Sequence, residues 1–519
     1  MTGPKLLIDT NILIGLEDHK AIDNSFSEFQ QKCQKFGVQL YVHEASKQDI
    51  GRDKDIKRRQ VILSKIAKFL PLGGMPVPDR GQLQQIYGKV RNDNDYVDVL
   101  LLYALHEVDA VDFLITQDLG IHKRAHALNI ADRVFRVEDA IVWLRDTYDR
   151  IKVSLPYIEE KECHQINRAD DIFQSLRDDY AGFDAWFNRS CVRNHRHCWT
   201  INFNDEISGI AIRKDESPAE FFNDLPSAKG RVQSDIEKIL KICTFKIKER
   251  HRGEKLGEQL IKQVLWWASK NSYDLVYLTV YPKHKYLIHV LTQYGFEAIG
   301  RSKGELYLAK AFRSGVLESS ADENPLAYHR QYYPNFRRHE AVSKYLVPIK
   351  GPYYETLFPE NVNKRQTELF DASSVGLVSR IPGNTIRKVY VCHAGIKSIR
   401  EGDILLFFHL KDDNSFHSQA LITVGITDGF DIVSHHDALL KLTAKRSVFS
   451  PEQLVEFTKN DTKSVKVINF LLAGHISPAI FYGRLQEIGI KGPYQSIRNI
   501  SHEHFQELEK DILLDVKTS

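Results

Sequence analysis

Short apolar runs alternate with amphipathic stretches along the first 148 residues. The runs at 6–8, 38–42 and 113–117 read as buried strands, and a continuous apolar run is typical of a parallel strand. Helical spacing over 21–36 and 92–105 places helices between them. The pattern predicts a parallel α/β/α sandwich for residues 1–148.

The pattern changes after residue 149. Residues 198–203 and 207–213 alternate like the two arms of a β-hairpin. The polar stretch 214–236 is expected to be a loop. A strand at 239–247 then runs through a Gly-containing turn into an amphipathic helix, and a further strand (275–280) and a helix ending near 294 follow. This order predicts an α/β domain over 149–315.

Residues 314–326 have the composition of a linker. Short strands follow in the last third, interrupted by a helix near 434–442 and another from 450. Short mixed strands with small helices predict a compact β-barrel within 316–519. The fold class expected for the chain is therefore multidomain α/β and α+β, in three parts.

The composition indicates the class of protein and the cellular compartment in which it is expected. The chain has 519 residues, a net charge of +3 and six cysteines without a C-x-x-C pair, so no disulfide scaffold is expected. The start has no signal-peptide pattern and there is no apolar run long enough to span a membrane. A reducing, cytoplasmic compartment is expected. The mild charge means that any nucleic-acid surface is local.

Acidic residues recur at the strand ends of the first part. Asp9 follows the first strand, Glu44 the second and Asp118 a later one, while Asp98 stands near a helix start. Converging carboxylates repel one another unless a divalent ion neutralises them, and oxygen ligands favour Mg²⁺ or Mn²⁺. Such ions activate water for phosphodiester cleavage. Asp95, three residues before Asp98, is a helix cap or an alternative ligand.

The motifs L-I-D-T-N, N-D-N-D-Y-V-D and L-I-T-Q-D together resemble those of PIN domain nucleases. The resemblance implies a metal-dependent ribonuclease with Asp9, Glu44, Asp98 and Asp118 as its acidic quartet. It also implies that Asn11 and Thr116 support these acids. By analogy with PIN toxins, it implies a bacterial toxin or antiphage effector held by an antitoxin-like partner protein.

The segment E-R-H-R-G-E-K-L-G between strand and helix can hold a pyrophosphate on backbone amides. The order of elements resembles that of GNAT-type N-acetyltransferases, which implies acetyl-CoA binding. The residues concerned are Arg250, Arg252, Gly253, Lys255, Leu256 and Gly257. Lys255 replaces the family's glycine, where its side chain can crowd the phosphates or add charge. Leu291 stands where the family often has an acid tyrosine, so a degenerate domain without acetyl transfer is the alternative.

Residues 328–345 interleave aromatic and basic side chains, which suits RNA stacking or the docking of one domain on another. Motifs within 380–500 resemble the PUA-like superfamily near its ASCH and EVE branches, implying a module that binds RNA, with tRNA a candidate, or modified nucleotides. Its pocket residues are expected to be Lys397, Arg400 and Gln495. The run from Cys191 to Cys198, with two histidines, matches no standard zinc spacing and reads as a hairpin edge.

These resemblances favour an endoribonuclease whose PUA-like domain selects the RNA. One alternative is an acetyl-CoA-dependent N-acetyltransferase acting on tRNA or protein, with the first part as a scaffold. Another is a non-catalytic RNA-binding regulator. Any of these is compatible with an oligomer.

Overall fold

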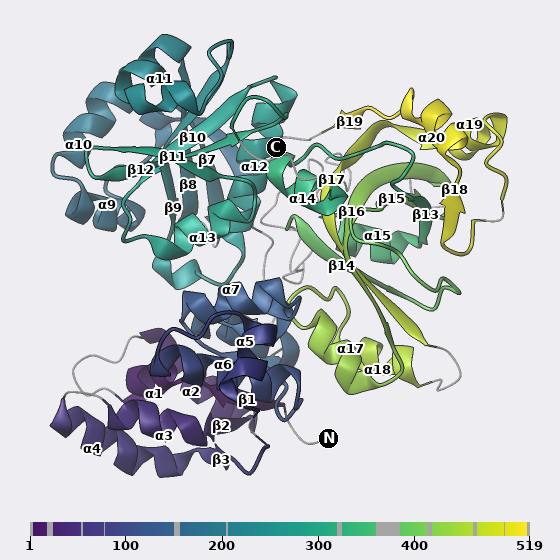
Figure 1. The fold of residues 1–519 in the computed structure, drawn as a ribbon. Helices are drawn as coiled ribbons and strands as arrows, with labels where there is room; N and C mark the ends of the chain where they lie inside the picture. Colours follow the sequence, from purple (N-terminus) through teal and green to yellow (C-terminus); the bar gives the residue numbers. More distant parts are fainter. Residues whose placement is uncertain are drawn as a thin grey trace.

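The structure is a computed structural model, and it places the described residues in three sheets with their covering helices (Figure 1). The described residues are 4–17, 24–52, 55–76, 78–149, 156–203, 206–318, 324–359, 385–412, 418–459, 464–492 and 494–515. Within these ranges, no helix combines the length and apolar character needed to cross a membrane.

The first sheet is parallel throughout, in the order β3-β2-β1-β4-β5. Its strands are β1 (Lys5–Ile8), β2 (Gln39–His43), β3 (Leu70–Leu72), β4 (Phe113–Ile115) and β5 (Val134–Phe135). Leu6 and Ile8 belong to one buried cluster and Leu7 to another, so helices cover both faces. The predicted α/β/α layering is therefore present. The edge strand β3 is not among the strands predicted from the sequence.

The helices of this part alternate with the strands. They are α1 (Thr10–Glu17), α2 (Asn24–Lys35), α3 (Glu44–Gly51), α4 (Ile56–Lys65), α5 (Arg80–Tyr87), α6 (Asp93–His106), α7 (Leu119–Ala127) and α8 (Val137–Leu144). Asn92, rather than Asp95, caps α6, because its side chain accepts from the Asp95 amide. Strand order reverses beside β1, and ligand sites of open α/β sheets gather at such a reversal.

The second sheet has the order β11-β12-β10-β9-β8-β7-β6. Its strands are β6 (Tyr157–Glu162), β7 (His197–Phe203), β8 (Glu206–Glu216), β9 (Ile239–Ile247), β10 (Leu275–Val280), β11 (Glu297–Ser302) and β12 (Glu305–Ala311). Only β9 and β10 pair in parallel. The mixed α/β domain expected here is present.

Five helices accompany this sheet, namely α9 (Gln174–Asp179), α10 (Phe183–Trp186), α11 (Pro218–Asp224), α12 (Leu256–Lys270) and α13 (Lys285–Thr292). The prediction of a loop over 214–236 is wrong. Ser217 and Glu220 form a capping box that starts α11, and Phe221 is fully buried beneath it.

The third sheet runs β14-β17-β16-β15-β13-β18, with β19 on β17. Its strands are β13 (Lys344–Ile349), β14 (Arg387–Cys392), β15 (Ile404–His409), β16 (Ala420–Val433), β17 (Val465–Phe481), β18 (Arg498–Ile500) and β19 (Leu514–Asp515). Its helices are α14 (Pro325–Tyr332), α15 (Gly351–Leu357), α17 (His436–Thr443), α18 (Pro451–Thr458), α19 (Tyr482–Glu487) and α20 (His502–Glu509). Among the described strands the pairing is an open path, with register shifts that bend β16, so the predicted closed barrel is not seen.

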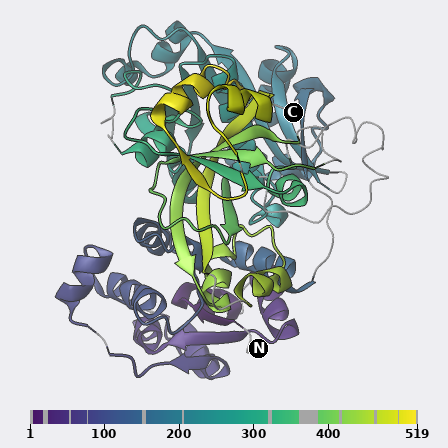
Figure 2. The same cartoon turned by 90° about the vertical axis from the view of Figure 1, so that its right-hand side faces the viewer.

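The second and third parts share one hydrophobic core, which includes Trp199 of β7 and Phe470 of β17. Figure 2 shows the sheet of the third part in front of the second part, with the first part below both. Tyr333 joins them, because its hydroxyl accepts from the Trp266 indole at 2.7 Å and donates to the Leu472 carbonyl at 2.8 Å. Tyr332 and Phe336 are also buried. The aromatic residues of 328–345 therefore serve domain docking, the alternative to RNA stacking.

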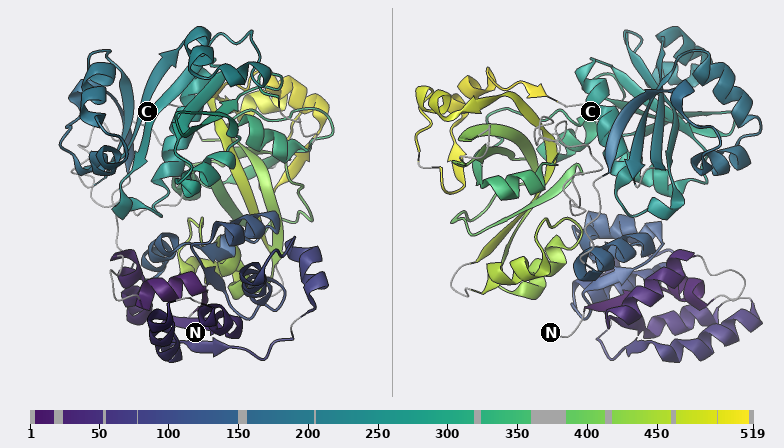
Figure 3. Two further views of the ribbon diagram at one scale, coloured as in Figure 1. Left: turned by 60° about the vertical axis from the view of Figure 1, so that its left-hand side comes forward. Right: turned by 180° about the vertical axis from the view of Figure 1, so that it is seen from behind.

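The first part meets the other two through polar contacts, with the three parts seen as separate lobes in Figure 3. Lys441 of α17 pairs with Asp109 at 2.9 Å, and Arg446 pairs with Asp132 at 2.9 Å. The Lys445 ammonium donates to the carbonyls of Ala131 and Val134. Segments of the first and third parts that lie far apart in sequence are thus held side by side near the centre of the molecule.

Candidate functional site

Strands β9 and β10 part from each other half-way along β9. Their pairing ends at Ile242 and Leu278, whereas β9 continues to Ile247. Cys243 is the extra residue of a β-bulge, since Ile212 pairs with Thr244 and Arg213 with Ile242. Beyond the bulge β9 has a partner on the β8 side but not on the β10 side, which leaves a free strand edge facing an opening.

The opening leads into a cavity of about 1760 Å³ at the centre of the molecule. Its walls come from all three parts, including Arg136 of the first, Thr244 of the second and Arg446 of the third. Ligand pockets commonly measure about 300–1,000 Å³. The cavity therefore has room for an extended cofactor and a second substrate together.

A tight turn joins β9 to α12 at one end of this cavity. Gly253 has φ +83° and Lys255 has φ +57°, both left-handed. Lys255 is the N-cap of α12 and makes no side-chain capping bond, so the first amides of α12 lack an intrahelical or capping partner. A helix N-terminus carries partial positive charge, which suits a phosphate.

Five of the six residues predicted to bind the cofactor line the cavity: Arg252, Gly253, Lys255, Leu256 and Gly257. The sixth, Arg250, does not. Its guanidinium is held by Glu206 and lies 3.2 Å from Asp171. Five of the predicted residues thus lie at the cavity, and their role in cofactor binding stays a prediction, whereas Arg250 is occupied by acids of the same part.

The first part lies directly against this turn. A Cβ atom on Gly253 would come within 2.6 Å of the Glu138 carbonyl oxygen, in the first turn of α8. Arg145 forms a two-pronged ion pair with Glu254, at 2.9 and 3.2 Å. The Lys255 ammonium donates to the Lys445 carbonyl of the third part. Nothing in the sequence signalled these contacts.

The cavity lacks the family's tyrosine at the expected position. Leu291 is buried in the core, and burial together with the Glu258 carboxylate raises the pKa of Tyr294, three residues on. His289 lines the cavity with its ring nitrogen 3.0 Å from the Gln293 amide. Burial lowers the pKa of His289, which keeps its imidazole neutral.

The acids of the first part gather around Asp9 at the end of β1. Thr116 donates to the Asp9 carboxylate at 2.6 Å and Asn11 at 2.5 Å, as expected for supporting groups. Burial raises the pKa of Asp9 to about 6, although the bonds from Thr116 and Thr10 lower it. Asp9 is therefore a buried, well-ordered carboxylate.

Asp98 faces the same space. Burial, and then the charges of Asp9 and Asp118, raise the pKa of Asp98 to about 8, against a lowering by Arg124. The Arg124 guanidinium lies 3.9 Å from Asp98 and 3.5 Å from Asp95. Asp98 is the acid that faces Asp9 and Asp118. The Arg124 guanidinium therefore offsets part of the negative charge around Asp98.

Glu44 and Asp118 are less suited to the predicted quartet. Glu44 is exposed and its carboxylate packs near Gly73. One oxygen of Asp118 caps α7 by accepting from the amides of Gly120 and Ile121. Among the described residues, no three of these acids bring their oxygens within 4.8 Å of one another. The predicted Mg²⁺ or Mn²⁺ quartet is thus only partly assembled.

The residues chosen for a pocket in the third part are all exposed, namely Lys397, Arg400 and Gln495. Arg400 bonds the Ala341 carbonyl and Ser343. None of the three lines the central cavity.

One comparison with known proteins bears on the second part of the chain. Residues 160–296 match the acetyltransferase (GNAT) family model. Solved structures with similar folds include a GNAT family acetyltransferase from Elizabethkingia anophelis with acetyl-CoA bound (14% identity, 30% of this chain and 97% of that one, TM-score 0.22). They also include ASCH from Zymomonas mobilis (12% identity, 33% and 96%, TM-score 0.22). No curated protein matches the chain.

The comparisons supply no evidence for a PIN domain or a nuclease and favour the acetyltransferase alternative. The turn and the β9–β10 opening both fall inside the matched segment. This chain is thus a multidomain mixed α/β protein, and its residues 160–296 match the acetyltransferase (GNAT) family model.

Proposed function

We propose that the protein is an N-acetyltransferase that takes acetyl-CoA at the β9–β10 opening. The observation that carries the proposal is the free edge of β9 beyond Cys243, which runs straight into the left-handed turn at the start of α12. Both features lie within the segment that matches the GNAT family model. Few other ligands need a strand edge and a phosphate turn in line.

The residues present fit this cofactor. Residues 244–247 pair with β8 on one side, and every second residue presents its amide and carbonyl on the open side. These groups can pair with an extended amide-containing arm, as a strand edge pairs with a peptide. The first amides of α12 can hold the diphosphate. Acetyl-CoA supplies the activated acetyl thioester. The acceptor amine attacks the thioester carbonyl, the carbon–sulfur bond breaks, and the amine proton leaves as the thiol forms.

The chain's own contribution to the chemistry is chiefly binding and orientation. Leu291 cannot donate a proton to the departing sulfur, and the Tyr294 hydroxyl is buried beside Glu258. Placing an amine beside a bound thioester accelerates transfer even without an acid, because the encounter becomes effectively unimolecular. We therefore expect a slow but specific transferase.

The test is thioester consumption by the full chain. The protein is mixed with acetyl-CoA and either bulk tRNA or a lysine-rich protein, and CoA release and acetylated product are both followed. Gly257→Asp, which places a negative charge in the phosphate turn, is the matched variant. The proposal predicts transfer by the wild type and loss in Gly257→Asp. Equal CoA release by both proteins, with no acetylated product, would contradict it.

A second candidate function is metal-dependent cleavage of RNA by the first part. The observation in its favour is the electrostatic coupling of Asp9, Asp98 and Asp118 across the reversal of strand order. Burial and, after it, the charge of Asp118 raise the pKa values of both Asp9 and Asp98, and a divalent cation would stabilise such carboxylates. Asn11 and Thr116 would hold Asp9 in place.

This function is tested by RNA cleavage with Mn²⁺, comparing wild type with Asp9→Asn and with EDTA present. Asp112→Asn serves as the control, because Asp112 is an acid of the same part whose carboxylate accepts from the Lys5 amide. Cleavage abolished by Asp9→Asn and by EDTA, but not by the control, is the expected result. Cleavage that survives both treatments would exclude this site.

A further inference from the structure

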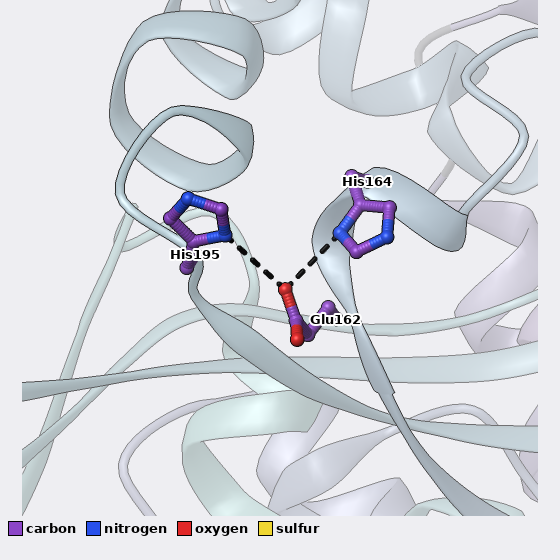
Figure 4. A group of neighbouring side chains, drawn as sticks. All are labelled: Glu162, His164 and His195. Atoms are coloured by element: carbon purple, nitrogen blue, oxygen red, sulfur yellow. Dashed lines mark hydrogen bonds and ion pairs between the residues drawn. The ribbon is translucent and has the colours of Figure 1, made fainter.

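Two histidines and a glutamate meet on the outer edge of the second sheet, away from the central cavity. Glu162 ends β6, His164 stands in the next turn, and His195 precedes β7 (Figure 4). One oxygen of Glu162 lies 3.1 Å from Nδ1 of His164 and 3.3 Å from Nδ1 of His195. It is the one group of three or more such side chains in the described chain whose ligand atoms all lie within 4.8 Å.

The backbone holds the three side chains together. The Cys163 amide donates to the Arg196 carbonyl at 2.8 Å, which ties the two turns to each other. His195 has a left-handed φ of +48°, in a turn closed by its amide on the Val192 carbonyl. The Gln165 side chain accepts from the Glu162 amide. A left-handed histidine is uncommon, and here this conformation belongs to the turn that presents the ring.

We propose that Glu162, His164 and His195 bind a divalent first-row transition metal, with Zn²⁺ as the ion to test. Zn–N and Zn–O bonds measure about 2.0–2.2 Å, so neighbouring ligand atoms of a tetrahedral site lie about 3.3–3.5 Å apart. The two measured separations from Glu162 fall within about 0.2 Å of that range. Two imidazoles and a carboxylate suit Zn²⁺ rather than Mg²⁺. Water would fill the fourth position.

The cysteines of this segment are not ligands. Cys191 and Cys198 are fully buried, and Arg196 places its guanidinium 3.8 Å from the Cys191 sulfur. His197 also points elsewhere, toward Glu160 at 3.4 Å. The spacing within the run from Cys191 to Cys198 therefore shows no zinc pattern. The run contributes one ligand, His195, and the other two ligands lie more than thirty positions earlier in the sequence.

Exposure sets the expected affinity. The His164 and His195 side chains are 51% and 79% exposed and Glu162 is 36% exposed. Water competes at such a site, so binding in the micromolar range is expected rather than the tight binding of a buried zinc finger. Both imidazoles must be neutral to bind a metal ion, because each binds it through the lone pair of a ring nitrogen.

The test is calorimetric titration of Zn²⁺ into the full chain at pH 7.5, with His164→Ala, His195→Ala and Glu162→Gln. His284→Ala is the control, since His284 contacts a single carboxylate, Asp179 at 3.2 Å. Asp9→Asn is run in parallel to separate metal bound by the first part. Co²⁺ absorption reports the ligand types.

One Zn²⁺ should bind the wild type, and each site variant should weaken that binding about tenfold or more. The His284→Ala and Asp9→Asn variants should retain it. The Co²⁺ spectrum should show tetrahedral bands without a thiolate charge-transfer band. Zn²⁺ binding that is absent from the wild type, or equal in wild type and His164→Ala, would overturn the proposal.

Discussion

Lys255 occupies a backbone conformation that glycine prefers, and this gives a prediction with a worked magnitude. Its φ of +57° lies in the left-handed region, which costs a residue with a Cβ about 1–2 kcal/mol. Glycine avoids that cost but loses about 0.5–1 kcal/mol more backbone entropy on folding. The balance favours glycine over alanine at this position by about 0.5–1 kcal/mol.

The comparison is between Lys255→Gly and Lys255→Ala. Both variants lose the bond from the Lys255 ammonium to the Lys445 carbonyl, so their difference isolates the backbone. For a folding unit of about 150–250 residues, 1 kcal/mol shifts Tm by about 2–4 °C. Thermal unfolding should therefore place Lys255→Gly about 1–4 °C above Lys255→Ala.

The Lys255→Gly variant also tests the binding of acetyl-CoA. The Lys255 side chain extends from the phosphate turn to the third part and its ammonium is held there, so it adds bulk at the turn without a free charge. Acetyl-CoA should bind Lys255→Gly more tightly than wild type in a calorimetric titration. If Lys255→Ala unfolds at the same temperature as Lys255→Gly or at a higher one, residue 255 does not adopt the left-handed conformation on which this prediction rests.

Three further predictions concern the interface, the acids and the missing tyrosine. Arg145→Ala removes both bonds to Glu254 and should speed amide hydrogen exchange at residues 249–257; unchanged exchange would show that Arg145 does not hold the turn. The folded pKa of Asp98 is raised to about 8, above its unfolded value near 3.9, so its contribution to stability is present at low pH and is lost as pH rises from about 4 to 8. In the absence of divalent ions, the free energy of unfolding should be lower at pH 8 than at pH 6, by up to about 1.4 kcal/mol per pH unit. The Asp98→Asn substitution should reduce this pH dependence. An equal pH dependence in wild type and Asp98→Asn would be evidence against the raised pKa. Leu291 is buried in the core and does not line the cavity, so Leu291→Tyr should lower the melting temperature without raising the rate of CoA release; faster release by a folded variant would show that position 291 reaches the thioester.

Much of the architecture follows from local pattern. The continuous apolar runs of β1 and β4 identify parallel strands, because both faces of each strand are covered. The Gly-containing turn before α12 was visible because it joins a strand to an amphipathic helix. In contrast, α11 was missed, since seven residues with a single buried aromatic give almost no periodic signal.

The candidate sites were harder to predict because they depend on long-range contacts. No local pattern could place Glu138 against Gly253 or Lys445 beside Lys255. Nor could it bring His195 to Glu162. In the first part, the order of the acidic residues could be recognised in the sequence. Arg124, in contrast, lies beside Asp98 only because α6 and α7 pack together. Sequence thus reveals the candidate residues, whereas tertiary packing decides their neighbours.

If the β9–β10 opening and the turn before α12 bind acetyl-CoA, as proposed, the full chain should bind it in solution. The most direct measurement is calorimetric titration of acetyl-CoA into the full chain, beside Gly257→Asp and beside an acetyl thioester that lacks the nucleotide diphosphate. We expect acetyl-CoA to bind the wild type saturably. The Gly257→Asp substitution, or loss of the nucleotide diphosphate from the ligand, should each weaken binding at least about tenfold, or about 1.4 kcal/mol. No saturable heat from the wild type at millimolar acetyl-CoA, or equal binding by wild type and Gly257→Asp, would contradict the proposal.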